Sequence, residues 1–168
     1  GYTQPCLVKM LEDGQLDTTF ADQGVLYIEQ AIQFNFAGIH AELNLDGNVV
    51  VAATIDGADR RYVAFCVDSE TGELVSSFGD DGMKMSTYTS PFCAAHDLAI
   101  HPQSGEITIV GSAGTSDYDN GVWRLTSDGQ ETGMCGGDSF QIMMATQYDN
   151  GFRACGYNEN NKLVIAGQ

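Results

Sequence analysis

The sequence predicts an all-β protein, and three observations support this fold class. Short apolar segments alternate with turns rich in Gly, Asp and Asn, residues that supply positive φ and local side-chain hydrogen bonds. No segment shows a sustained helical period with capping residues. One motif occurs three times along the chain at nearly constant intervals. Together these features favour sheets over an α/β arrangement.

Composition indicates one compact unit over 1–168. The chain is 43% hydrophobic and 18% charged, as in ordinary globular proteins. It has no apolar run long enough to cross a membrane as a helix, which needs about 18 residues or more. The first residues, GYTQPC, lack the regions of a secretory signal, so we expect either a precursor trimmed before Gly1 or no export by that route. The formal charge of −16 argues against nucleic acid and anionic membranes as partners.

The repeat is visible in two sets of residues. Leu16 and Phe20 return as Leu74 and Phe78, both at the same interval, and a third copy of the same turn begins at Asp128. A second set is an apolar run after a turn, preceded in each copy by an Ala-rich segment. The runs are DGNVVVAAT (46–54), SGEITIVGS (104–112) and NNKLVIAGQ (160–168), and the Ala-rich segments are 36–43, 93–100 and 152–157. Fixed self-similarity of this kind predicts a repeat architecture.

Each copy contains about four short strand candidates. In the first copies these are Cys6 to Leu11, Gly24 to Gln30, Phe36 to Leu43, Asn48 to Ile55, Tyr62 to Val67 and Gly82 to Tyr88. Four strands in a repeat of about 56–58 residues are typical of a β-propeller blade; a β-solenoid, whose coils are usually shorter, is the alternative. We therefore expect three four-stranded blades, with repeats over 12–68, 69–126, and 127–168 plus 1–11.

These segments resemble the delta-sixty repeats, a family of propeller-like repeats found mainly in bacterial secreted or surface proteins. The matching segments are DGQLDTTFADQGV (13–25), TGELVSSFGDDGM (71–83), HPQSGEITIVG (101–111) and NKLVIAG (161–167). The third copy departs from the pattern, because Cys135 stands where Phe20 and Phe78 stand in the others. The resemblance implies a propeller-like fold and an extracellular or surface location. It carries over no catalytic residues and no cofactor.

The order of segments predicts how the chain associates. The strand expected after Gly167 is found instead at the N-terminus, so we expect Cys6 to Leu11 to complete the last blade in a circularly permuted arrangement. Three blades are too few to close a ring. A two-chain ring, a head-to-tail filament and a fragment of a longer array remain open. The expected assembly residues are Cys6, Leu7, Val8, Lys9, Met10, Leu11, Leu163, Val164, Ile165, Ala166 and Gly167.

Five cysteines are candidates for disulfides: Cys6, Cys66, Cys93, Cys135 and Cys155. Their spacing does not suit zinc, and the odd number leaves at least one thiol free or paired with another chain. Cys6, in the strand expected to be donated, could lock two subunits covalently. A buried thiol in a β core is the other interpretation.

Catalytic candidates are few. His96 beside Asp97, with His40 and His101, is the only set that resembles acid–base machinery, and there is no GxSxG motif. An enzyme acting on an extracellular polymer, a lyase or hydrolase, is the corresponding alternative; a hydrogen-bonded structural histidine explains the same residues.

The acidic turns and the aromatic residues offer two further hypotheses. Asp80, Asp81, Asp117 and Asp119, together with Asp56 and Asp59, could bind calcium. Their spacing matches neither an EF-hand loop nor the calcium-binding nonapeptide repeat, and turn geometry accounts for them. Tyr118, Tyr148, Phe152 and Trp123 could form a sugar-stacking surface, although core packing accounts for Trp123. From the whole sequence we expect a noncatalytic extracellular or surface scaffold, structural or adhesive, that forms homo-oligomers or homopolymers. A carbohydrate-binding module with a glycan partner is the further alternative.

Overall fold

The computed structural model describes residues 6–28, 34–55, 60–115, 118–133, 139–143 and 151–167, and over these ranges the chain forms twelve β-strands and no helix. The strands make two four-stranded and two two-stranded sheets, in which every pair of strands is antiparallel. The all-β prediction is confirmed. Within the described part, the chain offers no helix of the length and apolarity that a membrane crossing requires.

The first four-stranded sheet is a meander of β3 (Phe34–Leu43), β4 (Val49–Ile55), β5 (Arg61–Val67) and β6 (Met83–Met85). Its central strands are continuous apolar runs, as expected where both faces are covered. The turn between β3 and β4 forms because the Asn44 side chain accepts backbone N–H groups from Asp46 and Asn48, at 3.0 and 2.9 Å. Gly47 provides the positive φ of 81° that this turn needs.

The second four-stranded sheet repeats this order with β7 (Ala94–Ile100), β8 (Ile107–Ala113), β9 (Asp119–Leu125) and β10 (Phe140–Met143). The spacing follows the sequence repeat, because β8 follows β4, and β9 follows β5, at the interval that separates Leu74 from Leu16. We call these two sheets the middle sheets.

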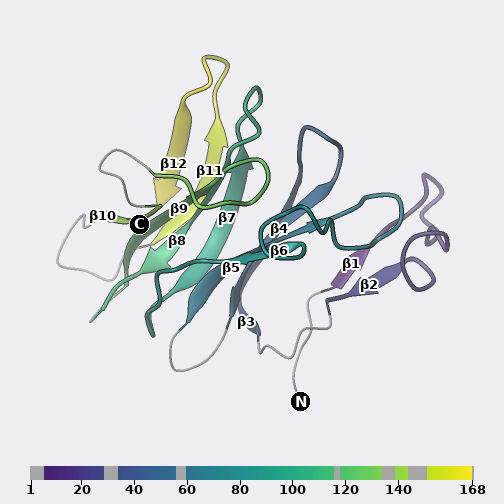
Figure 1. The fold of residues 1–168 in the computed structure, drawn as a ribbon, viewed down its shortest axis with the longest axis horizontal. Helices are drawn as coiled ribbons and strands as arrows, with labels where there is room; N and C mark the ends of the chain where they lie inside the picture. Colours follow the sequence, from purple (N-terminus) through teal and green to yellow (C-terminus); the bar gives the residue numbers. More distant parts are fainter. Residues whose placement is uncertain are drawn as a thin grey trace.

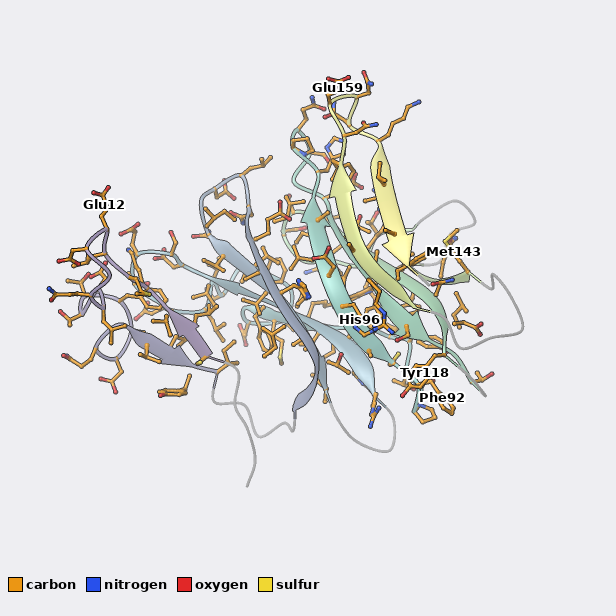
Figure 2. All side chains as sticks on the ribbon, turned by 180° about the vertical axis from the view of Figure 1, so that it is seen from behind. Glu12, Phe92, His96, Tyr118, Met143 and Glu159 are labelled. Carbon is orange, nitrogen blue, oxygen red and sulfur yellow. The ribbon has the colours of Figure 1, made fainter. Side chains whose placement is uncertain are left out.

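The two short sheets lie at opposite ends of the row of sheets (Figure 1). The N-terminal ribbon pairs β1 (Cys6–Val8) with β2 (Val25–Tyr27), and the C-terminal ribbon pairs β11 (Phe152–Tyr157) with β12 (Leu163–Gly167). Glu12 and Glu159, in turns of the two ribbons, are accordingly far apart in Figure 2.

Within one chain, therefore, the first strand does not complete the last sheet, and this part of the sequence prediction needs correction. β1 pairs with β2 and β12 pairs with β11, and both middle sheets lie between them. The prediction of three four-stranded blades is likewise met by only two four-stranded sheets. The first middle sheet, from Phe34 to Met85, takes strands from both of the first two expected repeats.

The largest hydrophobic cluster lies between the two middle sheets. Val50, Tyr62 and Ala64 contribute from one side, and Ile109 and Trp123 from the other. The Tyr62 hydroxyl donates a hydrogen bond to the Ser112 carbonyl of the opposite sheet, at 3.0 Å. Sheets packed face to face in this way bury apolar side chains from both, which is the main source of their stability.

The ribbons cover the outer faces of the middle sheets. A second cluster joins Leu7, Leu26 and Ile28 of the N-terminal part to Val51 and Phe65 of the first middle sheet. The C-terminal ribbon packs through β11 on β7 and β8 of the second middle sheet. The molecule is thus a row of four stacked sheets whose two end members have two strands each.

Candidate functional site

The C-terminal ribbon is equivalent to the first two strands of each middle sheet. The same backbone hydrogen bond closes the turn between the first two strands in each case. Across the turn between β11 and β12, Asn158 N donates to Lys162 O at 3.0 Å. Asn44 N donates to Asn48 O at 2.8 Å between β3 and β4, and His101 N donates to Glu106 O between β7 and β8. Counting on from these turns, Leu163, Ile165 and Gly167 of β12 correspond to Val49, Val51 and Ala53 of β4 and to Ile107, Ile109 and Gly111 of β8.

The N-terminal ribbon is equivalent to the last two strands of each middle sheet. Lys9 N donates to Gly24 O at 3.1 Å, and Cys66 N to Gly82 O and Arg124 N to Ser139 O repeat the same bond. Val8 therefore corresponds to Phe65 and Trp123, and Met10 corresponds to Val67 and Leu125. The chain thus carries the first half of a four-stranded sheet at one end and the second half at the other.

Equivalent side chains are buried in the middle sheets and exposed in the ribbons. Phe65 and Trp123 are fully buried, whereas Val8 is 49% exposed; Val67 and Leu125 are fully buried, whereas Met10 is 59% exposed. Val164 is 57% exposed, and its counterparts Val50 and Thr108 are fully buried. The difference arises because each buried counterpart has both a neighbouring strand and a facing sheet. The ribbons therefore present apolar positions that elsewhere in this chain are covered.

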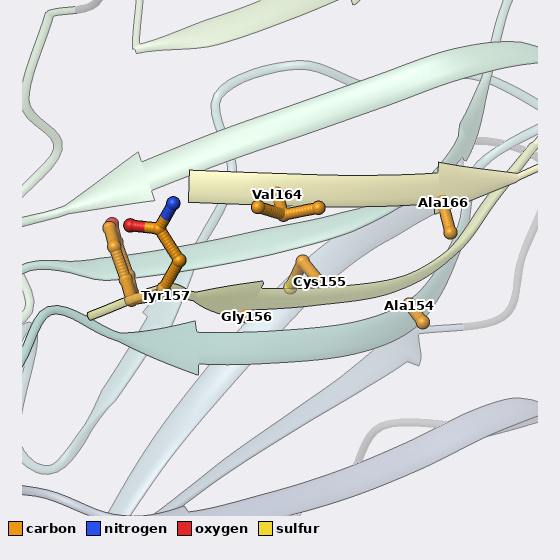
Figure 3. Close-up of a pocket in the computed structure, with 7 residues that line it drawn as sticks. Ala154, Cys155, Gly156, Tyr157, Val164 and Ala166 are labelled. Atoms are coloured by element: carbon orange, nitrogen blue, oxygen red, sulfur yellow. The ribbon is translucent and has the colours of Figure 1, made fainter. Parts of the chain in front are cut away.

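A groove lies on the C-terminal ribbon (Figure 3). It is lined by Ala154, Cys155, Gly156, Tyr157, Asn158, Val164 and Ala166. Val164 and Ala166 are exposed here, while their counterparts Val50 and Ala52 pack in the core between the middle sheets.

A second groove runs beside β1, between the N-terminal ribbon and the turn that joins β3 to β4. It is lined by Leu7, Val8, Lys9, Phe20, Leu43, Gly47, Val49, Ser69 and Glu70. Leu43 is 61% exposed. Sequence reasoning found the β1 residues but missed Leu43 and Val49, although their apolar character within predicted strands was a signal that something covers this face.

The N-terminal ribbon is fastened to the first middle sheet by polar contacts. Lys9 Nζ donates to Glu70 Oε2 at 2.9 Å and lies 3.4 Å from Asp17 Oδ2. The hydrogen bond to Glu70 raises the pKa of the Lys9 ammonium, with a further contribution from Asp17. Ala21 N donates to the Thr71 carbonyl at 2.9 Å. These contacts hold β1 in place. One edge of β1 pairs with β2, and its other edge faces the groove.

The candidate catalytic residues His40, His96 and Asp97 lie on the edge strands β3 and β7, and β11 contacts this group. His40 Nδ1 is 3.1 Å from Asp97 Oδ1, and Asp97 Oδ2 accepts the backbone N–H of Cys155 at 2.8 Å. His96 Nε2 lies 2.8 Å from an Arg153 guanidinium nitrogen and 3.1 Å from Ser112 Oγ. His96 sits at a β-bulge of β7, and a bulge changes the direction of the side chain it carries. The structure therefore brings His40, His96 and Asp97 into one region and joins them to strands of three sheets.

His101 lies outside this group. Its Nδ1 accepts backbone N–H groups from Gln103 and Ser104, and its ring meets Tyr157 edge-on at 4.9 Å. It shapes the turn between β7 and β8.

The four described cysteines are free thiols, so no disulfide forms among them within one chain. A disulfide between subunits through Cys6 stays a prediction. Burial raises the pKa of Cys66 to about 11 and those of Cys93 and Cys155 to about 12. Cys6 is exposed on β1. Cys135 lies outside the described residues.

The candidate calcium residues are dispersed. Asp80 Oδ2 is 3.2 Å from Lys84 Nζ, Asp81 takes a positive φ of 54° in its turn, and Asp119 begins β9. Asp56, Asp59 and Asp117 lie outside the described residues. Over the part of the chain that is described, no cluster of three or more His, Cys, Asp or Glu side chains is placed to hold a metal ion.

The aromatic candidates are also separated. Trp123 is fully buried and its indole donates to Glu131 Oε1 at 3.0 Å, as the core interpretation predicts. Tyr118 packs edge-on against Phe92, with ring centroids 5.2 Å apart (Figure 2). Phe152 begins β11, and Tyr148 lies outside the described residues.

Comparison with protein-family models, with curated proteins and with solved structures finds no match to this chain. The geometry of the two ribbons is therefore the basis for a functional proposal.

Proposed function

We propose that this chain is a noncatalytic structural subunit that joins copies of itself head to tail, with β12 of one copy pairing with β1 of the next. The composite sheet, β11–β12–β1–β2, would have the same strand order as the middle sheets and would complete a propeller-like blade. The observation that carries the proposal is the exposure of Val8, Met10 and Val164 at positions whose counterparts are buried.

The middle sheets supply the register of this pairing. Val51 is opposite Phe65 and Ile109 is opposite Trp123, so Ile165 would lie opposite Val8 of the next copy. Val49 opposite Val67 and Ile107 opposite Leu125 likewise place Leu163 opposite Met10. Side-chain alternation along a strand is strict, so a shift of one residue would turn the apolar set outward.

Both grooves would be filled by the same contact. The groove beside β1 occupies the position where the second strand of a complete sheet would lie, and β12 of a second copy has the matching pattern. The face of the C-terminal ribbon with Val164 and Ala166 would then cover Leu43 and Val49 of that copy. An unpaired apolar strand edge promotes association, and pairing by strand addition gives a specific, directional contact.

The contact is heterologous, because the two surfaces differ, so it generates a ring if the rotation closes and a filament if it does not. The acidic net charge of −16 and the resemblance to delta-sixty repeats support placing such an assembly outside the cell or on its surface, as a structural or adhesive scaffold.

Two substitutions and their mixture test the proposal. Val8→Lys blocks the β1 surface and Val164→Lys blocks the β12 surface; both side chains are already about half exposed, so each variant should fold. We expect each variant alone to be monomeric in sedimentation velocity at concentrations where the unmodified chain associates. The 1:1 mixture should form dimers and nothing larger, because it has one intact β12 surface and one intact β1 surface per pair.

Ser77→Lys is the matched control, since it adds the same charge in an exposed turn of the first middle sheet, and it should associate like the unmodified chain. A monomeric unmodified chain at every concentration, or unchanged association of both variants, would overturn the proposal.

A further inference from the structure

The contacts between adjoining sheets include a small backbone clasp. In the contact between the middle sheets, Gly79 N donates to the Asp128 carbonyl at 2.8 Å, and Gln130 Nε2 donates to the Gly79 carbonyl at 3.2 Å. Both polar groups of Gly79 are thus held by one turn of the next sheet. We call Asp128–Gly129–Gln130 the clasp turn.

The central residue of the clasp turn has to be glycine. Gly129 has φ of 78°, and a Cβ there would lie 2.8 Å from Gly79 N and from ring atoms of Phe78. Such distances are well inside van der Waals contact, so any side chain would push the two sheets apart. A glycine therefore lets the two backbones approach.

The contact between the N-terminal ribbon and the first middle sheet repeats part of this arrangement. Ala21 N donates to the Thr71 carbonyl at 2.9 Å, and a Cβ at Gly72, where φ is 77°, would lie 2.7 Å from the Ala21 Cβ. In both contacts, the residue just before a positive-φ glycine accepts a hydrogen bond through its carbonyl. The donor is a backbone N–H of the neighbouring sheet that comes earlier in the chain.

The N-terminal ribbon contains a turn that matches the clasp turn. Asp13–Gly14–Gln15 has the same three residue types, and its backbone closes in the same way. Leu11 N donates to Gln15 O and Gly14 N to Leu11 O, as Thr126 N donates to Gln130 O and Gly129 N to Thr126 O. Gly14 has φ of 84°, and Asp13 Oδ1 accepts the N–H of Gln15 at 3.0 Å. No described atom lies within 4 Å of the Cβ position of Gly14. The turn is therefore closed, but no described part of the chain occupies the space beside Gly14.

We infer that Asp13–Gly14–Gln15 clasps a backbone peptide group of a second copy of this chain. The inference rests on the proposed head-to-tail pairing, which places the preceding copy against this end of the N-terminal ribbon. Asp13 O accepts the N–H of that peptide, Gln15 Nε2 donates to its carbonyl, and Gly14 leaves room for it. A second copy is the occupant because the turns that match this one hold the preceding sheet of this same fold.

Substitutions at Gly14 and Gln15 test the inference. Gly14→Asn adds a Cβ, and asparagine tolerates a positive φ. Asn161 shows this, because it has a φ of 56° at the position of the β11–β12 turn that corresponds to Gly47. We expect Gly14→Asn and Gly14→Ala to weaken association at least tenfold in sedimentation equilibrium, and Gln15→Ala to weaken it by a smaller factor. The melting temperature of the dissociated monomer should change little. Gly72→Ala, in an occupied contact, should lower that melting temperature clearly.

The outcomes separate the two proposals. Association of the unmodified chain together with undiminished association of Gly14→Asn and Gly14→Ala overturns the clasp and leaves the strand pairing standing. An unmodified chain that never associates overturns the strand pairing and the clasp with it. Loss of association in both Gly14 variants, with normal melting, supports the clasp.

Discussion

At the scale of single residues, a few small or polar side chains decide how the sheets meet. Gly121 and Gly111 leave space for the Tyr62 hydroxyl, which bonds to Ser112 O across the core. A Cβ at Gly121 would lie 2.6 Å from the Tyr62 hydroxyl and 2.9 Å from Ala113 Cβ. Side chains also close turns of these sheets, and Asp68, which follows β5, is the clearest example.

Gly121→Ala should destabilise the fold, because the new methyl forces Tyr62 out of its position. Overpacking of this kind costs about 1–3 kcal/mol, to be measured by urea unfolding. Gly156→Ala is the control, since no described atom lies within 4 Å of its Cβ position. It should leave stability unchanged or raise it by up to about 1 kcal/mol. Equal effects of the two substitutions would contradict the packing argument.

Asp68 should make the stability of the fold decrease at acidic pH. Backbone N–H groups of Thr71 and Glu70 and the Thr71 hydroxyl bond to Oδ1 and lower the pKa of Asp68 from its usual 3.8. A lowered carboxyl pKa contributes stability above the unfolded-state value that is lost as pH falls through the folded-state value. Asp68→Asn should keep the turn and flatten the loss of melting temperature below about pH 4. An unchanged acid profile would count against this assignment.

The buried thiols of Cys66 and Cys93 and the half-buried thiol of Cys155 should react slowly. The thiolate is the reactive form, and burial raises the pKa values of Cys66, Cys93 and Cys155 to about 11 or 12. At pH 8 in the folded monomer, iodoacetamide should modify Cys6 before these three cysteines, as read by peptide mass spectrometry, and denaturant should abolish the difference. Rapid labelling of Cys66 in folded protein would show that the core is open.

At the scale of elements, the sequence predicted strands better than sheets. The Val49–Ile55 and Arg61–Val67 strands were found within a residue, because apolar runs and Gly-Asp-Asn turns are local features. The partner of each strand depends on contacts distant in sequence. The first strand was predicted to pair with the last, and within one chain β1 pairs with β2 and β12 pairs with β11. Leu43 and Val49 were not predicted as groove residues, because the apolar character of a strand position indicates that something covers it but not which sheet does.

Pairing of whole strands should also protect Cys6. It lies exposed on β1, at the edge that β12 of another copy would occupy. We expect the rate of Cys6 alkylation to fall as protein concentration rises through the association range. The Val8→Lys variant, which should not associate through β1, should show a constant rate. A rate independent of concentration in the unmodified chain, while it associates, would place the contact elsewhere.

At the scale of the whole molecule, the chain is two complete sheets between two half sheets. The sequence repeat predicted the recurrence of strands, and that recurrence also identifies which half sheet matches which. Sequence could not show that the halves lie at opposite ends, since that depends on how four sheets stack. The two matching halves and the apolar grooves beside them are the basis for proposing an assembly of copies.

Cross-linking at the proposed register tests this account most directly. In a Cys6→Ser background, Val8→Cys combined with Ile165→Cys places two thiols opposite each other across the composite sheet. Oxidation should then give a ladder of covalent oligomers on nonreducing electrophoresis that collapses with reductant. Val8→Cys combined with Val164→Cys, which faces the other side of the strand, should give none. A ladder of equal strength from both pairs, or from neither while the protein associates, would contradict the proposed strand pairing.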